Sequence, residues 1–329
     1  MKRFLALALC LAGCSPPGPE LKILTWSDYF AKDSIAAFEK EAGCTVRIDY
    51  IETSETLRTK LEGGASGYDV VFPSDEVLAG LVAKALLEKL DLSRIPNAAN
   101  VAARFKGLPY DPKNEWSLPY MTGTTGIAYR KDKISPAPDS WKAVFQGKAA
   151  LLDDAREVFA ASIRLQGAAW SAEGVARAVE PFKSWKPLAW DSNPKTLLVN
   201  GDVDVAQAFS GDALQAAEAL EGKVAYVIPK EGGTLWIDNL CIAKGAPRKD
   251  LAHRFIDHLL RPEISAAITN ERHFGNPNEA AWKLIRKELL ENPLIFPKDE
   301  ELKRLSLLPS LSGDLKKTLD QAWADLKAK

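Results

Sequence analysis

Residues 21–74 read LKILTWSDYFAKDSIAAFEKEAGCTVRIDYIETSETLRTKLEGGASGYDVVFPS, and apolar segments in this stretch alternate with amphipathic ones. Strand patterns cover residues 21–26, 44–51 and 68–72. Helical spacing covers residues 33–42, and Gly43 ends this helix. A second helix follows, which begins at its cap Ser54 and ends at Gly63–Gly64. This order of strands and helices predicts an α/β fold with a mainly parallel sheet and right-handed crossovers.

The same alternation returns after Tyr129. It predicts strands at residues 149–152, 203–209, 223–229 and 236–242, of which the first two lead into helices at Asp154 and at Gly211–Asp212. Two α/β lobes follow, which suits a length of 329 residues. We expect the chain to cross between the lobes at residues 119–126 and again near residues 236–238. The predicted limits are 21–128 plus 238–281 for the first lobe and 129–237 plus 282–329 for the second.

The composition excludes several classes of protein. Lys and Arg number 43 against 44 for Asp and Glu, and a net charge of -1 argues against a nucleic-acid binder. Apolar residues make up 46% and charged residues 26%, which is ordinary for a globular protein and excludes disorder for most of the chain. The only long apolar run lies at the N-terminus, so a polytopic membrane protein is also excluded.

The first residues are typical of a targeting segment. Lys2 and Arg3 precede an apolar run, residues 4–11, that is too short to span a bilayer, which predicts a signal peptide over residues 1–13. Leu11-Ala12-Gly13-Cys14 then resembles the lipobox of bacterial lipoproteins, in which the cysteine is acylated after cleavage. The alternative is an ordinary signal peptide with a chance cysteine. We favour a lipid anchor on Cys14, followed by a proline-rich tether over residues 14–20.

Cysteines and histidines give no indication of a metal site or a cofactor. Cys44 and Cys241 lie in apolar surroundings, and we favour two buried free thiols over a disulfide between them. His253, His258 and His273 are dispersed, and no CxxC or histidine-rich spacing is present.

Acidic and aromatic residues gather after the predicted strands, where open α/β sheets bind their ligands. Together with the small residues between them, they are Trp26, Ser27, Asp28, Tyr29, Ser74, Asp75, Glu76, Asp153, Asp154, Glu157, Phe209, Ser210, Gly211, Asp212, Trp236 and Asp238. Arg156 is the exception to an almost complete lack of cations among them. Carboxylates neutralise ammonium groups, and rings pack on methylene chains and face cations. The pattern therefore favours an organic polycation over an anion, which helix amides and Arg would bind, or a hard metal ion, which has no need of rings.

Each of these residues also has a structural interpretation. Asp154 and Glu157 form a good capping box at a helix start, and Ser74 suits an N-cap followed by the first-turn acids Asp75 and Glu76. Trp26 and Trp236 could belong to the core. We favour a ligand site because independent caps need not lie beside an aromatic residue at each strand end.

At these residues the sequence resembles the periplasmic spermidine/putrescine-binding proteins of polyamine ABC transporters. The resemblance covers nearly the whole chain after Cys14. It is carried by residues 25–29 (TWSDY), 68–74 (YDVVFPS), 152–159 (LDDAREVF), 209–212 (FSGD), 229–238 (PKEGGTLWID) and 291–297 (ENPLIFP). It implies a two-lobed type II periplasmic-binding-protein fold with hinge crossovers and a ligand enclosed in a central cleft.

The resemblance also implies roles for individual residues. Trp26, Ser27, Asp28 and Ser74 would line the first lobe, beside Tyr29. Glu157, Trp236 and Asp238 would hold an amine-bearing chain, and Asp154 and Asp212 would meet further amines. The sequence departs from the family at Phe209, usually Trp, at Phe274, usually Tyr, and at Glu76, where spermidine-binding members carry Tyr. A C-terminal glutamine contact has no clear match near Leu308–Ser310. Asp212 resembles putrescine-preferring members and Asp154 spermidine-preferring ones, so the choice of ligand stays open, with a slight preference for spermidine. Glu76 either meets a third amine or points to solvent.

The resemblance implies a receptor outside the cytoplasm that delivers spermidine or putrescine to an inner-membrane ABC permease. With the lipobox-like segment, we expect this receptor to be lipid-anchored through Cys14, and we expect it to be a monomer. We expect no catalysis, because no nucleophile–base arrangement is visible and Asp154 and Glu157 lie on one helix rather than flanking a bond. Two alternatives remain: a partner of a membrane sensor with the same ligand, and the same fold with another small ligand. Adjacent tyrosines, which iron-binding relatives use, do not occur.

Overall fold

The computed structural model describes residues 18–64 and 67–328. The predicted signal peptide and Cys14 therefore lie outside the described residues. No helix within them has the length and apolar character needed to cross a membrane.

One mixed sheet runs through the molecule, in the order β2-β1-β3-β10-β5-β8-β6-β7, with β4 and β11 paired to β10 and β9 paired to β5. The strands are β1 (Glu20–Trp26), β2 (Thr45–Ile51), β3 (Val70–Val71), β4 (Leu87–Glu88), β5 (Leu118–Arg130), β6 (Ala149–Leu151), β7 (Ala189–Trp190), β8 (Val205–Phe209), β9 (Val224–Val227), β10 (Gly233–Ala243) and β11 (Leu305–Ser306).

Helices cover both faces of this sheet. They are α1 (Ser34–Ala42), α2 (Ser54–Glu62), α3 (Asp75–Ala83), α4 (Ala155–Leu165), α5 (Ala172–Ala178), α6 (Lys195–Asn200), α7 (Ser210–Ala219), α8 (Lys249–Leu259), α9 (Pro262–Arg272), α10 (Lys287–Leu290), α11 (Asp299–Leu302) and α12 (Gly313–Lys327). Short 3₁₀ helices are η1 (Leu92–Arg94), η2 (Pro96–Asn100), η3 (Ala103–Phe105), η4 (Trp141–Phe145), η5 (Glu180–Lys183) and η6 (Glu279–Leu284).

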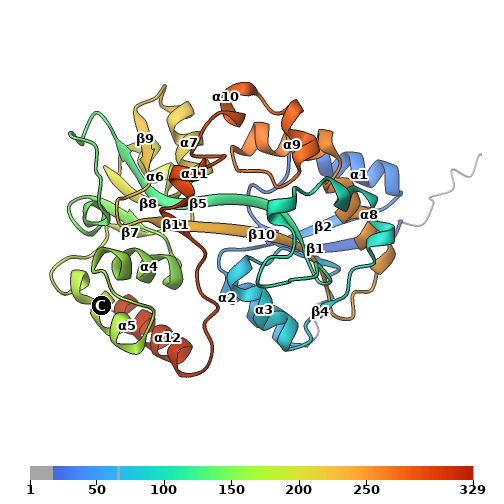
Figure 1. The fold of residues 1–329 in the computed structure, drawn as a ribbon, viewed down its shortest axis with the longest axis horizontal. Helices are drawn as coiled ribbons and strands as arrows, with labels where there is room; N and C mark the ends of the chain where they lie inside the picture. Colours follow the sequence, from blue (N-terminus) through green and yellow to red (C-terminus); the bar gives the residue numbers. More distant parts are fainter. Residues whose placement is uncertain (1–17, 65–66, 329) are drawn as a thin grey trace, which may run out of the picture.

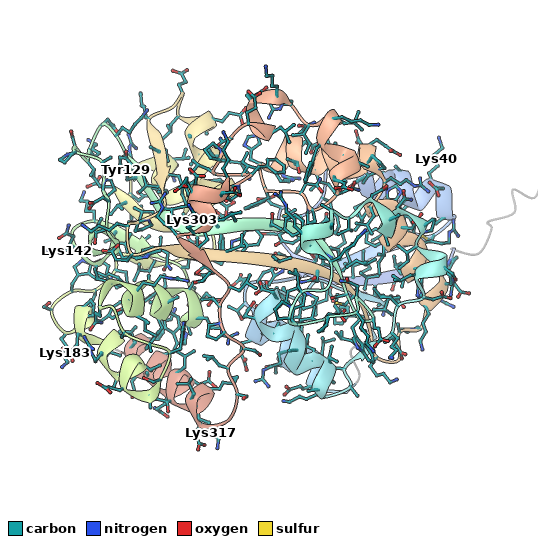
Figure 2. All side chains as sticks on the ribbon, viewed as in Figure 1. Lys40, Tyr129, Lys142, Lys183, Lys303 and Lys317 are labelled. Atoms are coloured by element: carbon teal, nitrogen blue, oxygen red, sulfur yellow. The ribbon has the colours of Figure 1, made fainter. Side chains whose placement is uncertain are left out.

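Two lobes are visible in Figure 1, with β1–β3 in one and β6–β9 in the other, and β5 and β10 run across both. In the first lobe α1 and α8 pack on one face of the sheet, where the rings of Phe38 and Phe255 lie 5.0 Å apart. Leu57 of α2 and Leu78 of α3 pack on the other face. In the second lobe α4, α5 and α12 share one core, and α6 and α7 share another. The lysines labelled in Figure 2 project from the outer surface of both lobes.

The parallel arrangement predicted from the sequence is confirmed within each lobe, because β1 pairs in parallel with β2 and β3, and β6 with β7 and β8. The strands that connect the lobes differ. β10 is antiparallel to β3 and to β5, and β5 is antiparallel to β8. The parallel strands of each lobe run toward the cleft. A strand that arrives from the other lobe, as β10 does in the first lobe and β5 in the second, enters from the cleft and therefore runs antiparallel to its neighbours. The predicted crossovers lie within these two long strands.

Local details explain where elements begin and end. Gly43 ends α1 as predicted, in a left-handed conformation with φ 64 in which its N–H donates to the Glu39 carbonyl. The predicted cap of α2 at Ser54 is wrong by one residue, because the Thr53 hydroxyl accepts from the Thr56 N–H and Ser54 begins the helix. Cys44 and Cys241 are buried free thiols, as predicted.

The last part of the chain packs on both lobes. Leu319 of α12 belongs to the core that α4 and α5 share, whereas Ile285 and Ile295 pack against Ala266 of α9. The lobe limits given above stay a prediction.

Candidate functional site

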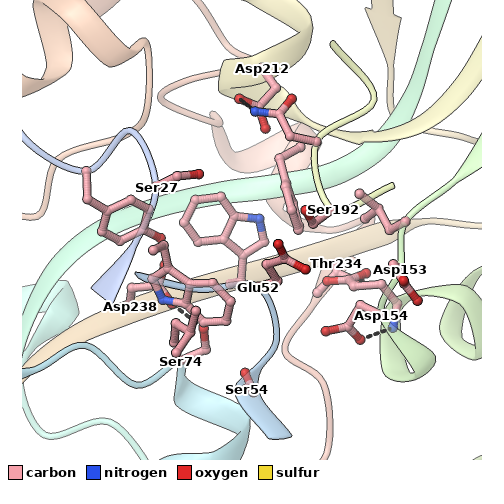
Figure 3. Close-up of a pocket in the computed structure, with 18 of the residues that line it drawn as sticks. Ser27, Glu52, Ser54, Ser74, Asp153, Asp154, Ser192, Asp212, Thr234 and Asp238 are labelled. Carbon is pink, nitrogen blue, oxygen red and sulfur yellow. Dashed lines mark hydrogen bonds between the residues drawn. The ribbon is translucent and has the colours of Figure 1, made fainter. Parts of the chain in front are cut away.

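A cavity of about 270 Å³ lies between the lobes, at the carboxyl ends of the parallel strands. Every ligand-binding residue predicted from the sequence lines it, although their role in binding stays a prediction. They are Trp26, Ser27, Asp28, Tyr29, Ser74, Glu76, Asp154, Glu157, Phe209, Asp212, Trp236, Asp238 and Phe274. Figure 3 shows Asp238 and Ser74 together on one side, Thr234 and Asp154 on the other, and Asp212 at a third edge.

Asp238 of β10 lies at the first-lobe side of the cavity and is 2% exposed. Its carboxylate accepts hydrogen bonds from the hydroxyls of Tyr29 and Ser74, which follow β1 and β3. Burial raises the pKa of Asp238 to about 7, and these hydrogen bonds oppose the rise. The prediction that Ser74 caps α3 is wrong for its side chain, which makes no capping hydrogen bond because it donates to Asp238 instead.

Glu157 of α4 lies at the second-lobe side and is 6% exposed. Its carboxylate accepts hydrogen bonds from the Thr125 and Thr234 hydroxyls, both at 2.9 Å. Burial and then the charge of Asp154 raise the pKa of Glu157 to about 7, against the opposing charge of Arg164. That arginine donates from Nη1 to the Thr234 hydroxyl at 3.0 Å.

Of the two residues interpreted as a capping box, Asp154 caps the helix and Glu157 does not. The Asp154 carboxylate accepts from the backbone N–H groups of Arg156 and Glu157, at 2.8 and 3.1 Å, so Asp154 is the helix cap. The Glu157 carboxylate instead binds two threonines from β5 and β10. The predicted capping box is therefore only half formed, and Glu157 is free of a capping role.

Trp236 lies on β10 between these two acids. Its ring is 5.8 Å from the ring of Phe209 and 5.4 Å from that of Phe274, both in edge-to-face arrangements. Gly123 on the adjacent β5 provides the room, because a Cβ at this position would lie 2.2 Å from the indole. Phe209 and Phe274, at which the resemblance leads us to expect Trp and Tyr, thus pack on the indole with apolar rings.

Asp28 and Asp212 form a third acidic corner, which two cations approach. Asp28 takes a left-handed backbone conformation with φ 57, and Asp212 lies in the first turn of α7 with 5% exposure. Lys195 Nζ lies 3.5 Å from Asp28 and 3.9 Å from Asp212, and Arg272 Nη1 lies 3.4 Å from Asp28. Burial raises the pKa of Asp212 to about 6, which Lys195 opposes and Asp28 reinforces.

Glu76 faces the cavity rather than solvent, since it is only 9% exposed, so the solvent-facing alternative is wrong. Burial raises its pKa, while Arg156, whose Nη1 lies 3.9 Å from the carboxylate, opposes the rise. Arg156 also donates to the Pro309 carbonyl at 2.7 Å, and neighbouring Leu308 lines the cavity. The segment around residues 308–310 therefore reaches the cavity.

Several lining residues were not predicted. They include Tyr50, Glu52, Ser192, Asn193, Thr234 and Leu308. Glu52 follows β2, so the same strand-end rule applied to residues 44–51 would have found it. Ser192 and Asn193 follow β7, whose two residues are too few to show a strand period. Among the described residues no group of His, Cys, Asp or Glu is arranged to hold a metal ion.

Comparison with known proteins identifies the relatives of this chain. A family model described as bacterial extracellular solute-binding protein matches residues 33–295. The chain belongs to this family. It is 32% identical to a putrescine/cadaverine-binding protein of Pseudomonas aeruginosa, with 99% of both chains covered. It is 30% identical to a spermidine/putrescine-binding periplasmic protein of Escherichia coli, over 86% of this chain and 84% of that protein.

A solved lipoprotein structure from Treponema pallidum superposes with a TM-score of 0.83 at 28% identity, over 94% of this chain and 100% of that chain. The resemblance stated from the sequence and the two-lobed periplasmic-binding-protein fold are thereby confirmed. Family members of this kind are solute-binding proteins that act outside the cytoplasm.

Proposed function

We propose that the protein binds a polyamine between its lobes and delivers it to an ABC permease without chemical change. The supporting observation is the pair Asp238 and Glu157. Each is a buried carboxylate held by two hydroxyl donors, and neither forms an ion pair within 4.0 Å with a Lys or Arg of the described residues. A buried carboxylate without a counter-ion is unfavourable, so each gains most from a ligand cation.

The separation along β10 of Asp238 and of Thr234, the partner of Glu157, is comparable to the reach of a short diamine. Side chains two residues apart share one face of a strand, so Thr234, which binds Glu157, lies on the same face of β10 as Trp236 and Asp238. Four residues at ~3.3 Å each separate Thr234 from Asp238 by roughly 13 Å. A diamine with four methylenes spans about 6 Å over five bonds of ~1.5 Å. A charge-assisted hydrogen bond of ~2.8 Å at each end brings this to about 12 Å.

The aromatic group between the acids suits the apolar part of such a ligand. Methylene groups would pack on the Trp236 indole, and the terminal ammonium groups would lie near its face, each such cation contact contributing about 0.5–2 kcal/mol. The cavity lining contains no Lys or Arg within the described part of the chain, and no cation pairs with Asp238 or Glu157 there, so a dication can approach these two acids without repulsion from a paired Lys or Arg. The names of relatives in Pseudomonas aeruginosa and Escherichia coli support the same ligand class.

Delivery and anchoring complete the proposal. The lipobox-like Leu11-Ala12-Gly13-Cys14 would tether the receptor to the outer face of a membrane, where an ABC permease receives the ligand. The similarity to a lipoprotein of Treponema pallidum supports such an anchor.

Calorimetric titration of the purified protein tests the proposal. We expect putrescine to bind with a Kd on the order of micromolar or below, about -8 kcal/mol or better. Arginine and glycine betaine serve as controls, since the first carries a carboxylate and the second lacks an ammonium N–H. Absence of binding by both putrescine and spermidine at millimolar concentration would contradict the proposal.

A further inference from the structure

Lys195 reaches from the second lobe to the first. It begins α6, and its ammonium group donates to Gln215 Oε1 at 2.9 Å within its own lobe. The same group lies 3.5 Å from Asp28 of the first lobe and 3.9 Å from Asp212 of the second. Its side chain is 22% exposed, so Lys195 is a partly buried cation held between two acids that line the cavity.

Arg272 completes this arrangement from the first lobe. Its Nε and Nη2 donate to the Phe30 carbonyl at 2.9 and 2.7 Å, which fixes the guanidinium, and its Nη1 lies 3.4 Å from Asp28. Gln215 Nε2 donates to the Arg272 carbonyl at 2.9 Å, so the two cations belong to one network. Asp28 and Asp212 carry two negative charges against the two positive charges of Lys195 and Arg272. This corner is therefore neutral without a ligand.

The other two acids of the cavity differ from this corner. Hydroxyl groups alone donate to the carboxylates of Asp238 and Glu157, and the ion pairs of the described residues include neither acid. A ligand ammonium group would neutralise a charge at each of these two positions. At the Asp28–Asp212 corner a ligand ammonium group would find the position between the two carboxylates already occupied by the like charge of Lys195.

We propose that Lys195 is a built-in counter-ion of the Asp28–Asp212 corner and makes the cavity select diamines over triamines. The inference rests on the proposed function, because it concerns which polyamine the same cavity accepts. A triamine keeps all its amines charged at neutral pH, since alkyl ammonium groups have a pKa near 10. An additional cation that approaches the Asp28–Asp212 corner must displace Lys195 or lie beside it, whereas a diamine held by Asp238 and Glu157 leaves the corner undisturbed.

The test compares putrescine and spermidine affinities by calorimetric titration of the wild-type protein and Lys195→Met, which removes the charge and keeps much of the length. We expect the wild type to bind putrescine more tightly than spermidine, which is the reverse of the slight preference drawn from the sequence alone. In Lys195→Met the ratio of the two dissociation constants should shift toward spermidine by on the order of tenfold. Lys195→Arg, which retains the cation, and Lys230→Met, which removes an exposed lysine that does not line the cavity, should leave the ratio unchanged.

Asp212→Asn supplies an independent test of opposite sign. With Lys195 in place and one acid removed, the corner carries a net positive charge, so the preference for putrescine should increase. Wild-type preference for spermidine, or an unchanged ratio in either Lys195→Met or Asp212→Asn, overturns the inference and leaves the proposed function intact. Failure of the wild type to bind any polyamine overturns both.

Discussion

Replacement of Asp238 by asparagine removes one charge from the site and little else. Asparagine has the same size, and its side-chain oxygen can still accept from the Tyr29 hydroxyl. Its NH₂ group can donate to the Ser74 oxygen, because a hydroxyl can rotate and accept. Asp238 lies within a strand and has no helix-capping role, so the variant separates ligand binding from backbone structure.

The structure sets the expected magnitudes. Burial raises the pKa of Asp238 from 3.8 to about 7, so an ionised Asp238 in the empty cavity at pH 8 costs at most about 4 kcal/mol, at ~1.4 kcal/mol per pKa unit. Asp238→Asn removes this cost, so the ligand-free variant should be as stable as the wild type or more stable. Loss of a buried charge pair with the ligand should weaken binding by about 2–5 kcal/mol, or roughly 30-fold to several thousandfold in Kd.

Thermal melts and calorimetric titrations with putrescine, run in parallel at pH 8, measure both effects. Asp139→Asn is the matched control, because it makes the same substitution at an exposed acid that pairs with Lys230 away from the cavity lining. Wild-type affinity in Asp238→Asn together with a much lower melting temperature would make Asp238 a structural residue and would refute the proposed binding site.

Three further predictions follow from the acids and the N-terminus. Putrescine affinity should rise from pH 5 to pH 8, because Asp238 and Glu157, each with a pKa raised to about 7, must ionise to bind it. Over about pH 4 to 7 the ligand-free protein should lose stability as pH rises, since its folded state holds protons that the unfolded chain has released. Titrations at stepped pH measure the affinity and melts measure the stability, and an affinity that does not change with pH contradicts the role of these two acids in binding. Glu157→Gln should weaken putrescine binding as Asp238→Asn does, with a few tenths of a kcal/mol of added instability at the start of α4, and retention of wild-type affinity in titration would exclude Glu157 from the site. Cys14→Ser should abolish fatty-acid incorporation in metabolic labelling and leave the protein unprocessed or released; unchanged labelling would disprove the lipid anchor.

The strand-end rule accounts for most of what the sequence could predict about the site. Apolar periodicity located β1, β2 and β3, and residues that follow β1 and β3, such as Asp28 and Ser74, do line the cavity. The rule needs only the positions of the strands, which local patterns give, because the carboxyl ends of parallel strands lie at the same edge of the sheet. Glu52, which follows β2 and lies outside the predicted set, also lines the cavity.

Local sequence patterns do not predict contacts between segments that lie far apart in the chain. Lys195 lies in a helix and Arg272 at the end of another, and nothing in their neighbourhoods indicates that both approach Asp28. Ser74 has the local sequence of a helix cap, but its hydroxyl binds Asp238, which lies 164 positions further along the chain. Asp154, in contrast, is the cap that its local sequence predicts, because its partners are its own neighbours.

A crystal structure of the putrescine complex tests the central claim most directly. We expect one ammonium nitrogen within about 3 Å of an Asp238 carboxylate oxygen, the other equally close to Glu157, and the methylene chain along the Trp236 indole. Lys195 should still bridge Asp28 and Asp212. Putrescine bound outside this cavity, or bound within it with both ammonium groups away from Asp238 and Glu157, would contradict the account.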